Sequence, residues 1–283
     1  MKKEYKMELL FKVSKTNKSS YYKWRNQESK AKEKETEEKR IIKAVEEIQE
    51  ENKYRYGVLP MTAALEKVKG IKCNHKKVYR LMKENNLLSE IKRKKEYKKA
   101  GKAHPKRNVL KRNFETSCPY DKIATDVTEI AMFGKKIYIS PIKDLHTRMI
   151  ESVEISNSAT GVTAKKMFEK IKDKAIAEGT IFHSDQGSIY TSKKYQKMLE
   201  ENNFIQSMSR KGTPIDNAPM ESFFSTLKSE VIYNPKVKIT NIKELKKEIE
   251  EYFVYYNEKR IQKGLGYLTP KEYKEKEIAK ICG

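Results

Sequence analysis

Three acidic residues stand in short sequence contexts that core packing does not require. Asp126 lies in Ala-Thr-Asp-Val-Thr, Asp185 in His-Ser-Asp-Gln-Gly, and Glu221 in Asp-Asn-Ala-Pro-Met-Glu-Ser. The first two end apolar runs typical of strands, and the third lies in a predicted helix that begins near Pro219. Carboxylates at strand ends beside a helix can converge on two divalent ions, and these hard oxygen ligands suit Mg²⁺ or Mn²⁺ better than Zn²⁺. The pattern indicates phosphoryl transfer on nucleic acid, with the three carboxylates as catalytic residues and ligands to two metal ions.

Each carboxylate taken singly has an ordinary interpretation, because an Asp at a strand end is often a surface residue and an Asp before Gln-Gly can cap a turn. Three such contexts in one chain favour a shared site. His183 and Ser184 suggest a hydrolase pair, but adjacent strand residues point to opposite faces of a sheet. Tyr190 lacks the Arg-rich surroundings of a tyrosine recombinase, so we interpret it as a core or substrate-positioning residue.

The charge balance indicates the same partner. The formal net charge is +23 and the isoelectric point is near 9.6, which favours a polyanion through counterion release and long-range steering. Positions 1–120 carry +18 and positions 121–283 only +5, so we expect DNA binding to be concentrated in the first part. Because 52 of the 62 basic residues are Lys, the alternative is a merely Lys-rich surface.

Other classes of protein are disfavoured. No apolar stretch approaches the roughly 18–20 residues needed to cross a bilayer, and the N-terminus lacks the apolar centre of a signal peptide. We therefore expect a cytoplasmic protein with no membrane partner. Cys73, Cys118 and Cys282 form no Cys-x-x-Cys pair, which argues against a zinc ribbon or a disulfide framework.

The N-terminal part reads as helical. Residues 1–56 predict a helical arm, with a helical run over about 36–52, and residues 57–90 predict a helix-turn-helix DNA-binding region in which Gly70 ends one helix and Asn74 caps the next. The second helix places basic side chains on one face and apolar ones on another, so the basic face could enter a DNA groove, although a solvated helix face is the ordinary alternative. The candidate DNA-contacting residues here are Lys76, Lys77, Arg80 and Lys83.

A basic linker is expected over residues 91–117. Within 91–112, eleven basic residues stand against one acidic residue and no apolar period is present. Such a segment can follow a phosphate backbone and become ordered on nucleic acid. Arg93, Lys94 and Lys95 are its candidate DNA contacts.

From residue 118 the pattern changes to strands and helices. Three β-rich runs (122–130, 135–144 and 149–156, the first two joined near Phe133-Gly134) precede a helix over about 160–177, and strands at 179–185 and 204–209 alternate with two further helices. This order predicts an α/β, ribonuclease-H-like fold with a mixed five-stranded sheet and flanking helices, preceded by the all-α helix-turn-helix region. We assign residues 118–235 to this core and 236–283 to a C-terminal helical extension.

Several motifs carry a resemblance to a known family. They are His183-Ser-Asp-Gln-Gly-Ser-Ile-Tyr190, Gln206-Ser-Met-Ser-Arg-Lys-Gly212, Asp216-Asn-Ala-Pro-Met-Glu-Ser-Phe-Phe224, Leu227-Lys-Ser-Glu230, Tyr256-Asn-Glu-Lys-Arg260, Thr269-Pro-Lys-Glu-Tyr273 and Asn74-His-Lys-Lys-Val-Tyr-Arg-Leu-Met82. Over roughly residues 20–275 the chain resembles the transposases of the bacterial insertion-sequence-three family, in their second-reading-frame subunit, with an integrase catalytic core like that of retroviruses.

The resemblance implies a DDE transposase, a polynucleotidyl transferase that uses Mg²⁺ or Mn²⁺ in DNA transposition, integration and recombination. It implies Asp126, Asp185 and Glu221 as ligands to two ions and Lys228 as a DNA contact two helical turns after Glu221. Asn217 is a supporting candidate, although an Asp-Asn pair at a helix start is also an ordinary cap. Arg210 and Lys211 are further candidate DNA contacts.

The implied partners are the terminal repeats of the element, target DNA, an upstream-frame transposase subunit or fusion, and further copies of the chain on DNA. Two alternatives are a catalytically idle DNA-binding regulator of the element and a ribonuclease-H-like nuclease without joining activity. Intact carboxylates argue against the regulator, and the helix-turn-helix region argues against the simple nuclease.

Overall fold

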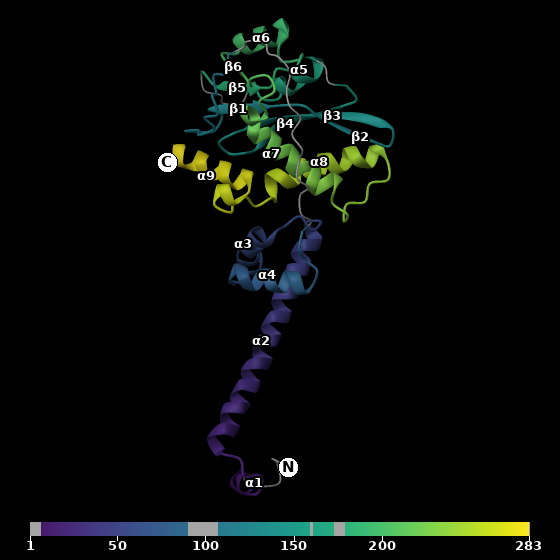
Figure 1. Ribbon diagram of the computed structural model, residues 1–283. Coiled ribbons are helices and arrows are strands. Elements are labelled where there is room, and N and C mark those ends of the chain that lie inside the picture. The colour runs from purple at the N-terminus through teal and green to yellow at the C-terminus, as the bar shows by residue number, and fades with distance from the viewer. Residues whose placement is uncertain (1–6, 90–106, 159–160, 173–178, 283) are drawn as a thin grey trace. The chain divides into compact units, whose positions relative to one another are not determined.

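The computed structural model describes residues 7–89, 107–158, 161–172 and 179–282 (Figure 1). The chain divides into two compact units, Met1–Ser89 and Glu90–Gly283. The candidate contacts Arg93, Lys94 and Lys95 lie outside the described residues. Across the described ranges, every helix falls short of the length or the apolar character that spanning a bilayer requires.

The N-terminal unit is all-helical. Its helices are α1 (Met7–Ser14), α2 (Lys18–Glu51), α3 (Val58–Lys69) and α4 (His75–Glu84). The expected cap is present, because the Asn74 side chain accepts a hydrogen bond from the backbone N–H of Lys76. Apolar residues of α2, α3 and α4 are buried together near the C-terminal end of α2. Val45, Leu65 and Leu81 are among them.

Helix α2 is much longer than the run expected over 36–52, since it begins at Lys18. Its first half is polar, so apolar periodicity could not reveal it. Pairs four residues apart, Glu28 with Lys32 and Glu35 with Lys39, give local support instead.

The second unit is built on one mixed sheet. Its strands are β1 (Lys122–Thr125), β2 (Thr128–Met132), β3 (Lys135–Asp144), β4 (Ile150–Ser156), β5 (Ile181–Ser184) and β6 (Ile205–Met208). β3 runs antiparallel to β1, β2 and β4, whereas β1, β5 and β6 are parallel neighbours. Thr125 pairs with Ile142 and Thr128 with Ile139, so β1 and β2 pair with β3 in the same register. They are two halves of the strand expected over 122–130, broken at residues 126–127.

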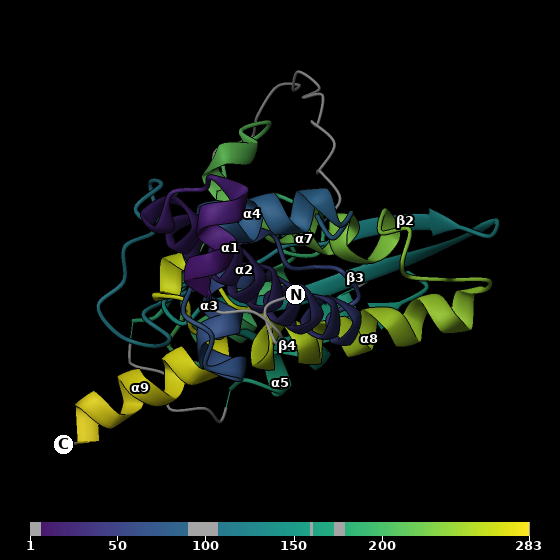
Figure 2. The ribbon, with the colours of Figure 1, turned by 90° about the horizontal axis from the view of Figure 1, so that it is seen from below.

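The hairpin between β2 and β3 turns as expected at Phe133-Gly134. Both residues have positive φ, 53° and 69°, as the commonest two-residue hairpin turn requires. Figure 2 shows β2 and β3 side by side up to this tip. β2 therefore extends the line of β1 beyond residues 126–127, toward the tip of the hairpin.

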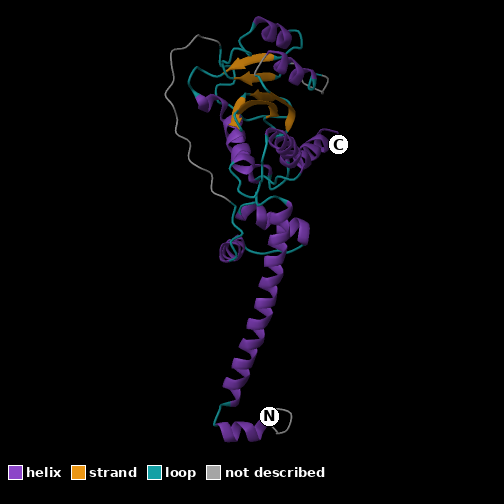
Figure 3. Ribbon diagram, turned by 90° about the vertical axis from the view of Figure 1, so that its right-hand side faces the viewer, coloured by secondary structure: helices purple, strands orange, loops and turns teal. Residues whose placement is uncertain are grey.

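Helices cover both faces of the sheet (Figures 1 and 3). They are α5 (Gly161–Glu169), α6 (Lys193–Glu200), α7 (Ala218–Leu227), α8 (Ile242–Glu258) and α9 (Pro270–Cys282), with a 3₁₀ turn at Pro214–Asn217, a π-helical turn at Lys228–Ile232 and a 3₁₀ turn at Lys263–Leu265. α5 and α6 lie on one face, and α7 to α9 lie on the other. The helix expected over about 160–177 is described as α5 only from Gly161 to Glu169, and residues 160 and 173–177 of that prediction lie outside the described residues.

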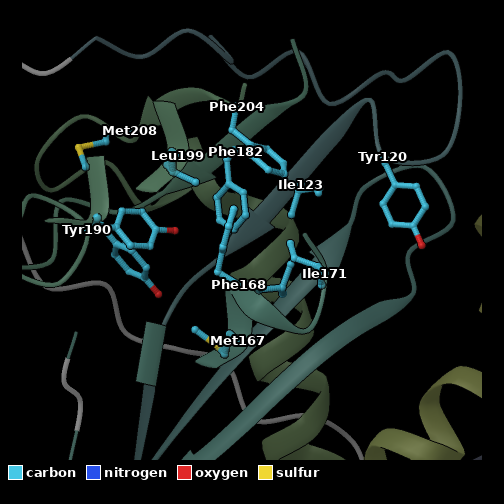
Figure 4. Packing of buried hydrophobic residues seen from close by; sticks show 12 residues of the cluster. Tyr120, Ile123, Met167, Phe168, Ile171, Phe182, Tyr190, Leu199, Phe204 and Met208 are labelled. Atoms are coloured by element: carbon cyan, nitrogen blue, oxygen red, sulfur yellow. The ribbon is translucent and has the colours of Figure 1, made fainter. Parts of the chain in front are cut away.

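The core between the sheet and α5 and α6 is aromatic. Phe182 of β5 packs against Phe168 and Phe204, with ring centroids 6.4 and 5.6 Å away, and those two rings are 5.3 Å from each other (Figure 4). Ile123 of β1 is fully buried in the same cluster. Because alternate strand residues face opposite sides, Ala124 and His183 must then face α7.

The C-terminal helices are fastened to the core by polar contacts. The Asn257 side chain donates to the carbonyl of Ile150 and accepts from its N–H, both at 2.9 Å, as a neighbouring strand would. Arg260 forms a nearly buried ion pair with Glu230 at 2.8 Å, and Tyr252 also donates to that carboxylate. These contacts make residues 236–283 part of the same compact unit as the sheet.

Candidate active site

The register of β1 and β5 brings two of the three carboxylates together. Lys122, Ile123 and Ala124 pair with Ile181, Phe182 and His183 in parallel. Continuing this register by two residues sets Asp126 beside Asp185, at the carboxyl edge of the sheet, where parallel strands lie about 4.8 Å apart. Both residues are partly buried and follow the last residue of their strand.

Asn217 links the helix that carries the third carboxylate to the same edge of the sheet. Its side-chain amide donates to the carbonyl of Thr125 at 3.1 Å, directly before Asp126. Asn217 is 4% exposed and makes no side-chain cap bond, so the cap interpretation is not what the structure shows. Helix α7 starts at the next residue and presents Glu221 in its first turn. The buried amide therefore fixes the start of α7 against the end of β1.

The three carboxylates line one cleft of about 390 Å³. Its other walls come from the loop after β5 and the loop that joins β6 to α7. The lining residues are Asp126, Asp185, Gln186, Gly187, Ser209, Arg210, Lys211, Gly212, Thr213, Pro214, Asn217 and Glu221. Among these described residues, no Cys or His lines the cleft.

The protein compensates the burial of Asp185 only in part. Burial raises the pKa of Asp185, and a hydrogen bond from the Gly187 N–H at 2.9 Å opposes this only in part. Asp126 accepts a bond from the N–H of Val127 at 2.8 Å. Asn217 Oδ1 is buried without a hydrogen-bond partner among the described residues. The cleft therefore holds oxygen atoms that a cation would stabilise.

Asp216, one residue before Asn217, differs from Asp185 because the protein itself neutralises its charge. Its fully buried carboxylate receives Arg210 in a two-bond contact at 2.8 Å and Arg112 at 2.7 Å, and Asn108 donates to it at 3.0 Å. The hydrogen bond from Arg210 is the main reason that the pKa of Asp216 is lowered. Arg210 thus borders the cleft with its guanidinium already paired. Lys211 also borders it and is exposed.

His183 is buried and links two neighbouring parts of the sheet by hydrogen bonds. Ser207 Oγ accepts the N–H groups of Val109 and Leu110, so its hydrogen is available for His183 Nδ1 at 2.8 Å. Nε2–H then donates to Ser209 at 3.0 Å. Burial lowers the pKa of His183 to about 4, so the ring is neutral at pH 7. These bonds join β5 to β6 and leave no hydrolase pair with Ser184, in keeping with the sequence argument.

Two further residues singled out in the sequence, Tyr190 and Lys228, do not line the cleft. Tyr190 is 1% exposed, and its hydroxyl lies 3.3 Å from Thr125 Oγ1, which assigns it to the core. Lys228 follows the end of α7 and starts the π-helical turn. The pKa of Glu129 is lowered mainly by a hydrogen bond from Lys136 and also by the charge of Lys228, so Lys228 lies near β2.

The basic face of α4 is partly neutralised. Arg80 contacts Glu38 at 2.6 Å and Glu84 at 3.1 Å, and Lys77 contacts Glu37 at 3.1 Å. Lys76 and Lys83 are exposed and form no ion pair with any residue that the structure describes.

Comparison with known proteins identifies the family. An integrase core domain matches residues 116–214, a second integrase core domain matches 203–270, and an HTH-like domain matches 36–95. The InsK transposase of element IS150 from Escherichia coli K12 is 40% identical, with 83% of this chain and 82% of that protein covered. The chain belongs to the insertion-sequence-three family of transposases. The transposase of element IS904 from Lactococcus lactis is 34% identical over 80% of this chain and 89% of that protein.

The comparisons also give a more distant transposase and a solved structure. The transposase InsF of element IS3A from Escherichia coli K12 is 29% identical over 81% of this chain and 80% of that protein. The solved HTLV-2 integrase catalytic core in complex with magnesium is 14% identical, with a TM-score of 0.42 over 55% of this chain and 97% of that one. The expected family, fold class and transposase function are confirmed.

Sequence reasoning missed two ion-paired carboxylates of this transposase. Asp216 and Glu230 lie inside motifs that carried the family resemblance, yet we assigned a role to neither. Glu230 of the Leu-Lys-Ser-Glu motif bonds Arg260 of the Tyr-Asn-Glu-Lys-Arg motif, 30 residues away. The co-occurrence of the two motifs was the only signal in the sequence that could have indicated this pair.

Proposed function

We propose that this transposase cleaves DNA strands at the ends of its insertion sequence and joins them to target DNA, as a polynucleotidyl transferase with two divalent metal ions. Asp126, Asp185 and Glu221 are the proposed ligands and catalytic residues. The observation that carries the proposal is that carboxylates from two parallel strands and one helix line a single cleft. Membership of the transposase family, shown by sequence similarity, also supports the proposal.

The donor set fits Mg²⁺ or Mn²⁺. It contains carboxylate oxygens and the unpartnered amide oxygen of Asn217, all hard ligands. In the described parts of the chain, no group of three or more Asp, Glu, His or Cys side chains is arranged to hold an ion by itself. In proteins, Mg²⁺ usually takes one or two carboxylates and completes its shell with water and substrate phosphate oxygens.

The residues have separate roles in the proposed reaction. Asp126 and Asp185 hold one side of the site because they end rigid strands, and Glu221 closes it from α7. Asn217 positions Glu221 by tying the start of α7 to β1. When bound, two metal ions would supply Lewis-acid charge for an in-line displacement at phosphorus, in which water or a DNA 3′-hydroxyl is the nucleophile. No covalent bond between protein and DNA is needed.

The proposed partners follow from the charge distribution. The exposed Lys76 and Lys83 of α4, the basic residues 91–112, and Lys211 and Lys228 of the catalytic unit are the proposed DNA contacts. Paired cations such as Lys77 and Arg80 can still contribute to the potential that attracts DNA. An upstream-frame subunit and further copies of this chain on DNA complete the proposed assembly.

The test uses the full chain, with and without the upstream-frame subunit, and labelled DNA from the ends of the element that encodes it. We expect cleavage and joining with Mg²⁺ or Mn²⁺ and none in EDTA. Ca²⁺ should bind and raise the melting temperature but support no turnover, because its looser coordination positions the reacting groups poorly. Cleavage that persists in EDTA would overturn the metal mechanism.

A further inference from the structure

A second pocket, which we call the basic pocket, lies on the opposite side of α7 from the acidic cleft. It has a volume of about 270 Å³. It is lined by Phe114, Lys143, Leu145, Arg148, Pro219, Ser222, Phe223, Thr226, Tyr256, Arg260 and Gln262. Phe223 follows Glu221 by two residues, which is more than half a turn of an α-helix, so the same helix forms one wall of each site. No acidic residue lines this second site in the described part of the chain.

Two cations in the basic pocket have no counterion. Lys143 is 7% exposed, and its ammonium meets only the carbonyl of Pro219 at 3.4 Å and the face of the Phe223 ring at 5.7 Å. Within the described ranges, neither Lys143 nor Arg148 forms an ion pair with a carboxylate. The third cation, Arg260, is neutralised by Glu230. A buried ammonium without an anion is costly, so the site favours a negatively charged ligand.

The position of the Arg148 guanidinium depends on a glycine. A Cβ added at Gly264 would lie 2.3 Å from Arg148 Nη1, so the guanidinium lies directly over the backbone at this residue. The backbone of Arg148 is itself left-handed, with φ of 58°, in a turn closed by bonds from Thr147 to Asp144. The turn and the glycine together hold this cation at the pocket.

A further polar group in the pocket lacks a partner. Gln262 is 8% exposed, and its Nε2 donor is buried without a hydrogen bond among the described residues. Leaving a buried donor unpaired costs about 1–3 kcal/mol. The Nε2 donor of Gln262 and the cations Lys143 and Arg148 therefore bring donors and positive charge together from separate parts of the chain, the combination that an oxyanion satisfies.

The size and chemistry of the pocket select a phosphate group. Sites for organic ligands occupy about 300–1,000 Å³, and this pocket falls just below that range. Planar guanidinium and ammonium groups together bind the oxygens of a phosphate well. The pocket is therefore suited to one phosphate and part of its sugar rather than to a whole nucleotide.

We propose that the basic pocket binds a backbone phosphate of the DNA strand on which the acidic cleft acts, which rests on the proposed function. A helix with its side chains is about 10–12 Å across, and one DNA strand rises about 3.4 Å per nucleotide. A strand that crosses α7 from the cleft thus reaches the pocket about three nucleotides from the scissile phosphate. The contact would fix the position of the strand relative to the carboxylates.

The experiment compares four forms of the full chain: wild type, Arg148→Gln, Gly264→Ala and the control Lys238→Gln. Gly264→Ala keeps every charge and displaces only the end of a flexible side chain. Lys238 is exposed, and its replacement changes the net charge as Arg148→Gln does. Melting temperatures establish that each form is folded.

Affinity for element-end DNA is measured by fluorescence anisotropy at several salt concentrations, in EDTA. We expect Arg148→Gln and Gly264→Ala to weaken binding several-fold and to reduce the salt slope by about one, the value for one phosphate contact, while Lys238→Gln changes little. Because no metal and no reaction are involved, a chain that binds DNA but joins no strands still tests the pocket.

Single methylphosphonates along each strand then locate the phosphate. At the contacted position the neutral linkage should weaken binding by wild type but not by Arg148→Gln, since the two changes remove one interaction. Inorganic phosphate at constant ionic strength is the second arm. If it stabilises wild type but not Arg148→Gln while DNA affinity is equal in all four forms, the pocket serves free phosphate and the DNA proposal is overturned. Equal behaviour of the four forms in both arms also overturns it.

Discussion

The carboxylates of the acidic cleft and the ion-paired carboxylates that precede and follow α7 in the chain are the same chemical group in opposite environments. In the cleft, Asp185 is partly buried, meets a single backbone N–H in the loop after β5, and has a raised pKa. Five residues before Glu221, in the 3₁₀ turn that precedes α7, Asp216 is fully buried but bonded by two arginines, and its pKa is lowered. Glu230, shortly after α7, is likewise bonded by Arg260.

The difference separates carboxylates that the protein itself neutralises from those that we propose as metal ligands. A buried charge that the protein itself neutralises contributes to the position of loops and helices. A partly buried carboxylate that the protein leaves without a cation costs stability in the free protein, and that cost is recovered when a cation binds. The comparison makes predictions that differ in sign between the two groups.

The largest expected effect is on the reaction. Glu221→Gln should lower strand cleavage and joining about a thousandfold or more, because metal charge stabilisation is worth several kcal/mol and each 1.4 kcal/mol is tenfold. Asp126→Asn and Asp185→Asn should behave alike. The check is strand transfer with Mg²⁺ beside DNA affinity in EDTA, which should not change. Full activity of Glu221→Gln would rule out the proposed triad.

The second expected effect is on stability. Glu230→Gln should lower the free energy of unfolding by about 2–4 kcal/mol, because it leaves the Arg260 guanidinium nearly buried without its anion. The matched control is Glu258→Gln, whose partner Lys271 lies on the surface, and it should cost less than about 1 kcal/mol. Urea unfolding measures both. Equal costs would contradict the distinction between the two kinds of carboxylate.

The third prediction concerns pH. The raised pKa of Asp185 means that its ionisation costs stability above the unfolded value of 3.8, so in EDTA Asp185→Asn should melt at or above the wild-type temperature near pH 7, with no difference below pH 3.8. The lowered pKa of Asp216 contributes stability above 3.8 that is lost as the pH falls through the folded pKa, so Asp216→Asn should melt lower at pH 7.

Thermal melts between pH 3 and pH 8 test both variants. Adding Mg²⁺ should raise the melting temperature of wild type and of Asp216→Asn, but not that of Asp185→Asn. Shifts of the same sign in the two variants at pH 7 would refute the comparison.

The smallest expected effect concerns α4, where unpaired and ion-paired cations are compared. Replacing the unpaired Lys76 and Lys83 with Ala should weaken DNA binding and reduce the salt slope by about two. Replacing Lys77 and Arg80, which are bonded to Glu37 and Glu38, should change the slope less and lower stability more. Anisotropy titrations and melts of both double variants decide the matter. A larger slope change for the paired residues would show that the α2 acids release them to DNA.

Local sequence signals predicted much of the fold. The Phe133-Gly134 turn, the Asn74 cap and the alternation of strands and helices led to the ribonuclease-H-like class, which is confirmed. The sequence did not predict the break at residues 126–127 or the π-helical turn at Lys228, because both arise where strands and helices meet distant parts of the chain. The early start of α2 was missed because polar helix faces carry no apolar period.

By itself, the sequence determined which residues stand at the ends of strands and at the start of α7, since periodicity and turn chemistry act over a few residues. Only the tertiary structure decided which charges are neutralised. Asp216 meets Arg112 across 104 positions. Within the described ranges, in contrast, Asp185 meets no such cation, and the pocket at which Lys143 and Arg148 gather is lined by no acid. The physical reason is that charges interact over a few ångströms in a partly buried environment, and separation along the chain does not set those distances.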